Sequence, residues 1–180
     1  YAATNKLAAG ACNDEEISKI QMLFNQAKIT TDYRKVTVAA KNHKQETGHT
    51  SAAIELEDGT IICGHSSELL GCSAALLLNV TKHLGDIDHN LKLIPQSMIE
   101  PIQYTKVNYL GGHNPRLHTD EVLVALSVLS ENDENCRVAL QQLPKLRGCQ
   151  AHCTVMLSDV DQRIFKKLGV NITCEPVLKK

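Results

Sequence analysis

The C-terminal portion of the chain constrains the fold most, because two short apolar runs there flank a strongly patterned helix. Residues 151–157 and 170–174 are predicted as strands, and residues 159–168 carry helical spacing between them. Ser158 and Asp161 are placed to cap that helix. A strand, a helix and a second strand in immediate succession favour a layered α/β fold with a mostly parallel sheet.

The same alternation of short strands and helices extends back to about residue 51. The segment from Ala53 to Cys63 predicts a hairpin whose Asp58-Gly59 turn fits the type I′ geometry. A helix is predicted over 68–84, with Gly85 as a left-handed stop. The other predicted elements are a strand over 91–94, a helix from Pro95 to about Val107, and helices over 120–130 and 134–143.

The residues before this alternation show helical patterns only. Asn13 and Glu16 are spaced as a capping box for a helix over 17–27, and a second helix is predicted from Thr30 to just before Thr47. Each helix carries one apolar stripe. We expect these stripes to pack on the rest of the chain or on a preceding region of a longer protein.

The sequence therefore divides into two predicted parts. Residues 1–49 form a helical segment, and residues 50–180 form an α/β domain with a helical excursion near 111–147. The chain opens at Tyr1 without an initiator methionine, from which we expect a C-terminal fragment of something longer.

Composition limits the classes of partner. Lys and Arg number 19 against 20 Asp and Glu, so the formal net charge is −1, which argues against a nucleic-acid partner. No apolar run reaches the about 18 residues of a membrane span, so we expect no membrane association through such a span. The seven cysteines are an odd number scattered through apolar segments, which favours reduced thiols and a cytoplasmic location.

The most informative functional feature is the polar loop from Gly111 to Glu121. Asn114 and Arg116 are candidate substrate-binding residues, since a guanidinium can hold a carboxylate or phosphate through two hydrogen bonds. His113 and His118 are candidate catalytic acids or bases, because histidine titrates near neutral pH.

Two carboxylates at the end of this loop complete the candidate site. Asp120 is a third candidate catalytic residue, because it or Glu121 could orient His118. The alternative is structural: Thr119 caps the next helix, and both carboxylates complement its dipole.

A second candidate follows the hairpin, at Gly64 to Glu68. Ser66 and Ser67 sit where a strand gives way to a helix, so backbone N–H groups there can hold an anion. Serine capping of the helix is the alternative, and the spacing lacks the Gly-Lys-Ser/Thr ending of a phosphate-binding P-loop.

Cys149, His152 and Cys153 form a further cluster, which Cys174 could join. Structural zinc usually shows paired Cys-x-x-Cys elements, so we expect no metal and assign Cys153 to the core, as we do Cys72. A nucleophilic Cys149 beside His152 is the remaining alternative.

Several long motifs in this chain occur in order in one known family. They are Thr50–Leu56, Ser67–Gly71, Glu100–Gln103, His113–Leu123, Gln142–Cys149 and Leu168–Pro176. The chain thereby resembles the C-terminal part of the bacterial domain of unknown function 1846, uncharacterised protein family 0371. The resemblance implies a cytosolic protein much longer than this chain.

The resemblance also implies a three-layer α/β/α sandwich similar to the cytidine-deaminase-like fold, with extra N-terminal and inserted helices. Zinc deaminases need a ligand followed two residues later by a glutamate, and a Pro-Cys-x-x-Cys element. Here Cys72 is followed by Ala74, and Gln96 and Ile99 stand where the thiolates belong after Pro95. Zinc-dependent deamination is therefore not expected.

Two functions remain open from the sequence. The first is a domain that binds, or acts on, an anionic small molecule without zinc; a nucleotide-like ligand is suggested by the fold analogy alone. The alternative is a non-catalytic scaffold that forms homo-oligomers or docks the preceding region of a longer protein. The residues identify no cofactor.

Overall fold

A mixed four-stranded sheet lies at the centre of the chain. The computed structural model describes residues 1–10 and 14–177, so the predicted cap at Asn13 lies outside the described residues. The strand order is β2-β1-β3-β4. The strands are β1 (Ser51–Glu55), β2 (Ile61–His65), β3 (Gln150–Cys153) and β4 (Asn171–Cys174).

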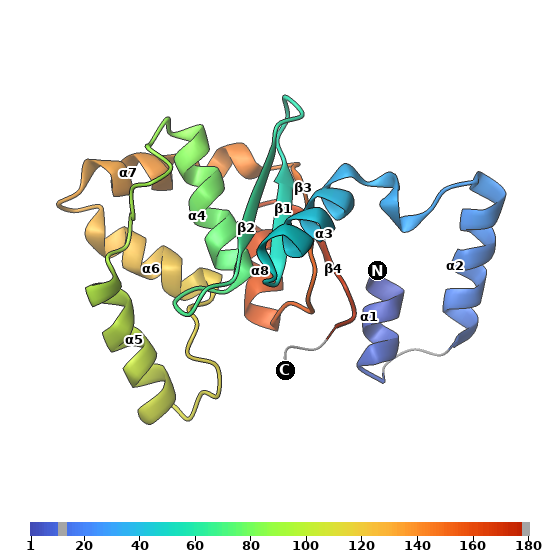
Figure 1. The fold of residues 1–180 in the computed structure, drawn as a ribbon, viewed down its shortest axis with the longest axis horizontal. Coiled ribbons are helices and arrows are strands. Elements are labelled where there is room, and N and C mark those ends of the chain that lie inside the picture. Colours follow the sequence, from blue (N-terminus) through green and yellow to red (C-terminus); the bar gives the residue numbers. More distant parts are fainter. Residues whose placement is uncertain (11–13, 178–180) are drawn as a thin grey trace.

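Helices surround this sheet and extend to both sides of it (Figure 1). The first half of the chain contributes α1 (Ala2–Ala8), α2 (Asp14–Ala27), the 3₁₀ turn η1 (Thr31–Tyr33), α3 (Lys35–Thr47) and α4 (Cys72–Leu84). The second half contributes α5 (Gln96–Asn108), α6 (Thr119–Leu129), α7 (Glu134–Gln141), the 3₁₀ turn η2 (Leu143–Leu146) and α8 (Asp159–Lys167). The prediction of an α/β class is confirmed, and each predicted helix is present with shifted ends.

The prediction of a mostly parallel sheet is wrong. The β1–β2 and β1–β3 pairs are antiparallel, and only the β3–β4 pair of the described strands is parallel. The hairpin forces β1 and β2 to be antiparallel. The helix between β3 and β4 carries the chain back to the end of the sheet where β3 began, so that β4 runs parallel to β3. The C-terminal unit thus behaves as predicted, but it makes up only half of the sheet.

The predicted strand over 91–94 is also wrong. These residues pair with no strand among those described. Leu93 and Ile94 are instead buried in an apolar cluster with residues of α4, α5 and α6. A short apolar run is buried equally well by helices and by a sheet, so its composition did not distinguish the two.

Three local features differ from the prediction. The Asp58-Gly59 turn is not type I′, because Gly59 has φ +83° whereas Asp58 is not in the left-handed region that this turn requires at both positions. Gly85 ends α4 with φ −95°, so it is not a left-handed stop. The predicted strand over 151–157 ends at Cys153, because its partner β1 begins at Ser51 and offers little backbone beyond that point.

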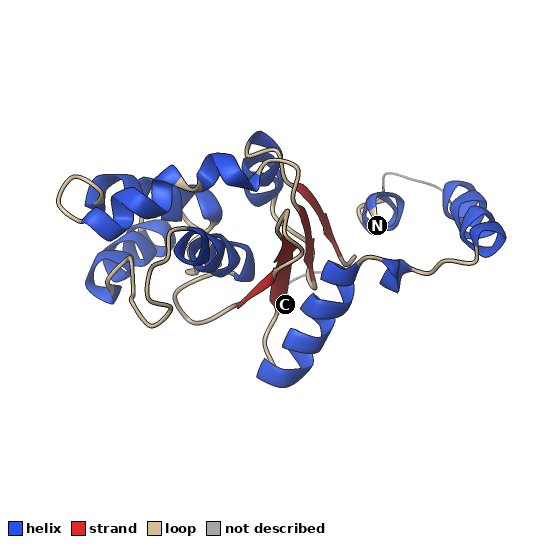
Figure 2. Cartoon of the chain, turned by 90° about the horizontal axis from the view of Figure 1, so that it is seen from above, coloured by secondary structure: helices blue, strands red, loops and turns tan. Residues whose placement is uncertain are grey.

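Helices cover both faces of the sheet (Figure 2). On one face, Val36 and Ala40 of α3 pack against Ala53 of β1. On the other face, Leu76 of α4 and Phe165 of α8 are buried within the main core. A second core joins α4 to α5, α6 and α7, and it places the 111–118 loop beside the N-terminus of α4.

The N-terminal helices stand beside this body. Asn5 of α1 donates to the carbonyl oxygen of Cys174 on β4 over 3.0 Å, while α2 lies farther from the sheet (Figure 2). Met22 and Leu23 of α2 are about 60% exposed.

Among the described residues, no helix combines the length and apolar content needed to cross a membrane. The predicted boundary near residue 49 stays a prediction.

Gly64 of β2 sets how closely α4 approaches the sheet. A Cβ placed on Gly64 would lie 2.4 Å from the backbone nitrogen of Leu76, a distance that no side chain tolerates. We therefore expect Gly64→Ala to destabilise the chain by about 3 kcal/mol, through overpacking.

Gly148→Ala is the matched control for this prediction. Gly148 has φ +87°, and no atom would lie within 4 Å of a Cβ placed on it. Alanine at this position therefore costs only backbone strain, about 1–2 kcal/mol of stability. Urea denaturation at neutral pH measures the free energy of unfolding of both variants. A smaller loss for Gly64→Ala than for Gly148→Ala would contradict the close approach of α4.

Candidate functional site

The two loops singled out in the sequence lie side by side. Leu117 N–H donates to the carbonyl oxygen of Leu69 over 2.9 Å, and Gly71 N–H donates to the carbonyl oxygen of Leu117 over 3.1 Å. Leu117 is fully buried, so this short parallel bridge is anchored by apolar packing. The bridge brings the backbone near Ser66 against the backbone near Arg116.

A pocket of about 290 Å³ opens where these loops meet the sheet. The pocket is lined by residues that precede β1 or follow β2 and β3. Hydrogen bonds connect the segments that carry these residues. Thr50 Oγ1 donates to Ser66 Oγ over 2.8 Å, and Ser51 N–H donates to Thr154 Oγ1 over 2.9 Å. Because Ser66 Oγ accepts from Thr50, its own hydroxyl hydrogen remains available to an acceptor in the pocket.

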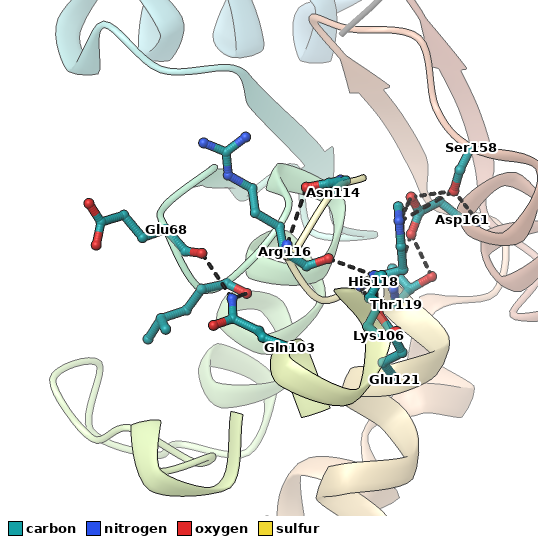
Figure 3. A network of polar contacts seen from close by, with 11 residues as sticks. Glu68, Gln103, Lys106, Asn114, Arg116, His118, Thr119, Glu121, Ser158 and Asp161 are labelled. Carbon is teal, nitrogen blue, oxygen red and sulfur yellow. Dashed lines mark hydrogen bonds and ion pairs between the residues drawn. The ribbon is translucent and has the colours of Figure 1, made fainter. Parts of the chain in front are cut away.

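The charges around this pocket are of one sign. Lys44 and Arg116 line it together with His49, and none of the described residues that line it is acidic. Arg116 Nε donates to the carbonyl oxygen of Ser67 over 2.5 Å, which fixes the side chain and leaves its terminal nitrogens for a ligand. In Figure 3 the guanidinium of Arg116 points away from His118.

The N-terminus of α4 opens at the same pocket. Gly71 is the N-cap residue with extended backbone, and as a glycine it has no side chain to cap the helix. Gly71 and Cys72 both line the pocket. The first turn of α4 therefore directs the positive end of the helix dipole at the pocket, which favours a bound anion.

The alternative in which Ser66 and Ser67 cap the helix over 68–84 is wrong. The helix begins four residues later, at Cys72, because the backbone at Leu70 and Gly71 pairs with Leu117. Ser67 Oγ instead accepts from the backbone N–H groups of Leu69 and Leu70, over 3.2 and 3.1 Å. Ser67 therefore stabilises the loop, while Ser66 faces the pocket.

A second network holds His118, at the start of α6 (Figure 3). His118 Nδ1 lies 3.0 Å from Asp161 Oδ2, and Ser158 Oγ donates to the same oxygen over 2.7 Å. Thr119 donates to Asp161 Oδ1 from its backbone N–H over 3.0 Å and from its hydroxyl over 2.9 Å. The carboxylate of Asp161 thus joins the N-termini of α6 and α8.

The environment of Asp161 favours its charged form. Asp161 is fully buried, and burial by itself would raise the pKa of its carboxyl. The hydrogen bonds from His118, from the Thr119 backbone and from Ser158 outweigh burial and hold the pKa well below its usual range. The network therefore joins the two helices through a buried carboxylate that stays charged.

A third set of contacts fixes the path of the 111–118 loop. Lys106 Nζ donates to Glu121 Oε2 over 2.7 Å and to the carbonyl oxygen of Arg116 over 2.8 Å. Glu121 also accepts from His118 N–H over 2.7 Å, which makes His118, rather than the predicted Thr119, the N-cap residue of α6. Asn114 Oδ1 accepts from Arg116 N–H over 3.2 Å, so Asn114 supports the loop backbone.

The structure separates the residues that the sequence grouped together. Ser66 and Arg116 share the pocket, whereas His118 faces Asp161 and does not line the pocket. His113 is exposed. Asp120 is half-buried, with one carboxylate oxygen that has no hydrogen-bond partner among the described residues. The side chain that contacts His118 is Asp161, which the sequence indicated only as part of a helix cap.

The cysteine cluster lies on β3 and at the residue just before it. Cys153 and Cys72 are buried in the main core, as predicted, with their Sγ atoms 3.2 Å apart. Burial raises the pKa of the Cys149 thiol, which disfavours a nucleophilic thiolate. His152 points to the opposite face, where burial lowers its pKa to about 4. Within 1–10 and 14–177, no three metal-ligating side chains converge.

These features define a mixed α/β domain with a cationic pocket at the N-terminus of one helix. A family model described as "Domain of unknown function DUF1846, C-terminal" matches residues 32–180. The chain belongs to this family, so the resemblance noted in its sequence is confirmed.

Three bacterial relatives, each named as a UPF0371 protein, illustrate the similarity. Those of Corynebacterium urealyticum and Corynebacterium glutamicum strain R are 49% and 48% identical to this chain, and that of Streptococcus pyogenes serotype M5 is 43% identical. Each match covers 91% of this chain and 33% of the relative. The chain thus spans about a third of the length of these relatives.

The buried, charged carboxylate of Asp161 leads to a prediction about stability. Asp161→Asn keeps the size of the side chain but removes its charge, and we expect a loss of about 3 kcal/mol at pH 7. Because the native carboxyl has a depressed pKa, its contribution is fully present at neutral pH, begins to fall below about pH 4, and is lost only as pH falls through the lower pKa of the folded state. Denaturant unfolding at pH 7 and at pH 3 measures the effect. The difference in free energy of unfolding between wild type and variant should be smaller at pH 3 than at pH 7.

Asp159→Asn serves as the control, because Asp159 is exposed in the first turn of the same helix. Its removal should cost only about 0.5 kcal/mol through the helix dipole. Equal losses for the two variants at pH 7, or a loss for Asp161→Asn that is no smaller at pH 3 than at pH 7, would contradict the role assigned to Asp161.

Proposed function

We propose that this chain binds an anionic small molecule through a phosphate or carboxylate group. The observation that carries the proposal is the pocket at the N-terminus of α4, which two cationic side chains line and no described carboxylate does. A cationic pocket without carboxylates attracts anions and repels cations, whatever the rest of the ligand is.

Each group at the pocket has a distinct part in this binding. Arg116 is held at Nε, so its terminal nitrogens present a fixed pair of donors to two oxygens of one anion. Ser66 supplies a hydroxyl hydrogen, and the first turn of α4 supplies the positive end of its dipole. Lys44 adds charge at the rim. A nucleotide-like ligand still rests on the deaminase-like fold that the family resemblance implies.

The proposed function stops at binding, although the contact between His118 and Asp161 has a geometry that suits proton transfer. Asp161 holds His118 at Nδ1, an arrangement that leaves Nε2 for proton transfer. His118, His113 and Asp120 do not line the pocket, which is why binding, rather than a reaction, is the conclusion here. The alternative function, a scaffold that self-associates or docks the rest of a longer protein, is favoured by one observation, the exposure of Met22 and Leu23 on α2.

Titration calorimetry with inorganic pyrophosphate tests the binding function. We expect wild type to bind and Arg116→Gln to bind at least tenfold more weakly, because a charged hydrogen-bond donor contributes about 1.5–3 kcal/mol. Arg147→Gln is the matched control, since Arg147 is an exposed arginine that does not line this pocket. At about 100 times its dissociation constant, the ligand should also add roughly 2.7 kcal/mol of stability.

The outcomes separate the two functions. Equal weakening by Arg116→Gln and Arg147→Gln would contradict the pocket. If wild type binds no pyrophosphate and sedimentation equilibrium shows a concentration-dependent dimer, the scaffold function is favoured instead.

A further inference from the structure

A second pocket, of about 410 Å³, lies between α4, α5 and the segment that connects them. Ser67 lines this pocket and Ser66 lines the anion pocket, so the loop after β2 separates the two. Aliphatic side chains form most of its wall: Leu69, Leu70, Leu78, Leu93, Ile94 and Ile99. Such a wall favours an apolar ligand over a bare inorganic anion.

One cation is buried in this apolar wall. Lys82, in the last turn of α4, is 8% exposed and lines the pocket. Its Nζ donates to the carbonyl oxygen of His89 over 2.7 Å and to that of Leu91 over 3.4 Å. An ammonium group has three N–H donors, so one remains without an acceptor among the described residues.

The charge of Lys82 has no partner in the described part of the chain. No carboxylate there lies within 4.0 Å of its Nζ, and no described residue that lines the pocket is acidic. Burial lowers the pKa of Lys82, and the more distant charge of Asp88 only partly offsets this. The two carbonyl groups hold the connecting segment in place, but they neutralise no charge. A buried, unpaired ammonium is costly unless something supplies the opposite charge.

We propose that this pocket binds a monocarboxylate with an apolar body, with its carboxylate against Lys82 and its body against the aliphatic wall. The carboxylate accepts the remaining N–H of the ammonium group. The aliphatic residues then bury the body of the ligand. A small inorganic anion would leave that aliphatic part of the pocket unfilled. This site is distinct from the pocket at Arg116 and does not depend on the function proposed for that pocket.

Titration calorimetry with butanoate, hexanoate and octanoate tests the site in the intact chain. We expect affinity to rise about fourfold for each added methylene, because each is buried against apolar side chains. Octylamine, with the same body and the opposite charge, should not bind.

Two substitutions identify the pocket. Lys82→Met should weaken octanoate binding at least tenfold, whereas Lys92→Met, which changes an exposed lysine at the same pocket, should not. If Lys82→Met fails to fold, Ala75→Leu provides the test, since Ala75 lines the pocket and a larger side chain there should block octanoate.

Three results would overturn the proposal. They are equal affinity for all three chain lengths, octanoate binding that survives Lys82→Met (or Ala75→Leu, where Lys82→Met does not fold), and octanoate binding that Arg116→Gln abolishes. The last result would place the carboxylate in the anion pocket.

Discussion

The backbone bridge between Leu117 and the Leu69–Gly71 segment is the constraint on which the rest of the site depends. It joins two segments about 45 residues apart, and the complete burial of Leu117 keeps them together. Through this bridge Arg116 reaches the end of the sheet where Ser66 lies. The same pairing delays the start of α4 to Cys72, so that the first turn of the helix opens at the pocket rather than under a serine cap.

Three helix N-termini meet near this bridge, and they are satisfied in different ways. The buried carboxylate of Asp161 accepts from the first residue of α6 and from Ser158, the N-cap residue of α8, so the chain supplies its own anion there. The N-terminus of α4 has a glycine at its N-cap and faces a cationic pocket. A carboxylate of the chain thus lies at two of these helices, whereas cationic side chains lie at the third, which is where we expect an anionic ligand.

Local chemistry in the sequence predicted much of this arrangement, but not its partners. The cap formed by Ser158 and Asp161 depends on residues three apart, and it is present. That Asp161 also binds His118, 43 residues earlier in the chain, depends on how α6 packs on α8, which no local pattern specifies. Sheet direction was missed for a similar reason, since the antiparallel pairing of β1 with β3 joins strands about 100 residues apart.

The central claim is that anion-binding groups converge at the N-terminus of α4. Titration of the ¹⁵N-labelled chain with inorganic pyrophosphate, followed by amide chemical shifts, tests it most directly. The account predicts saturable shifts concentrated at Ser66, Gly71 and Cys72 and at the Arg116 Nε–H, with little change around Asp161. Small, non-saturating shifts spread over the surface lysines, or no shift at the α4 N-terminus, would contradict it.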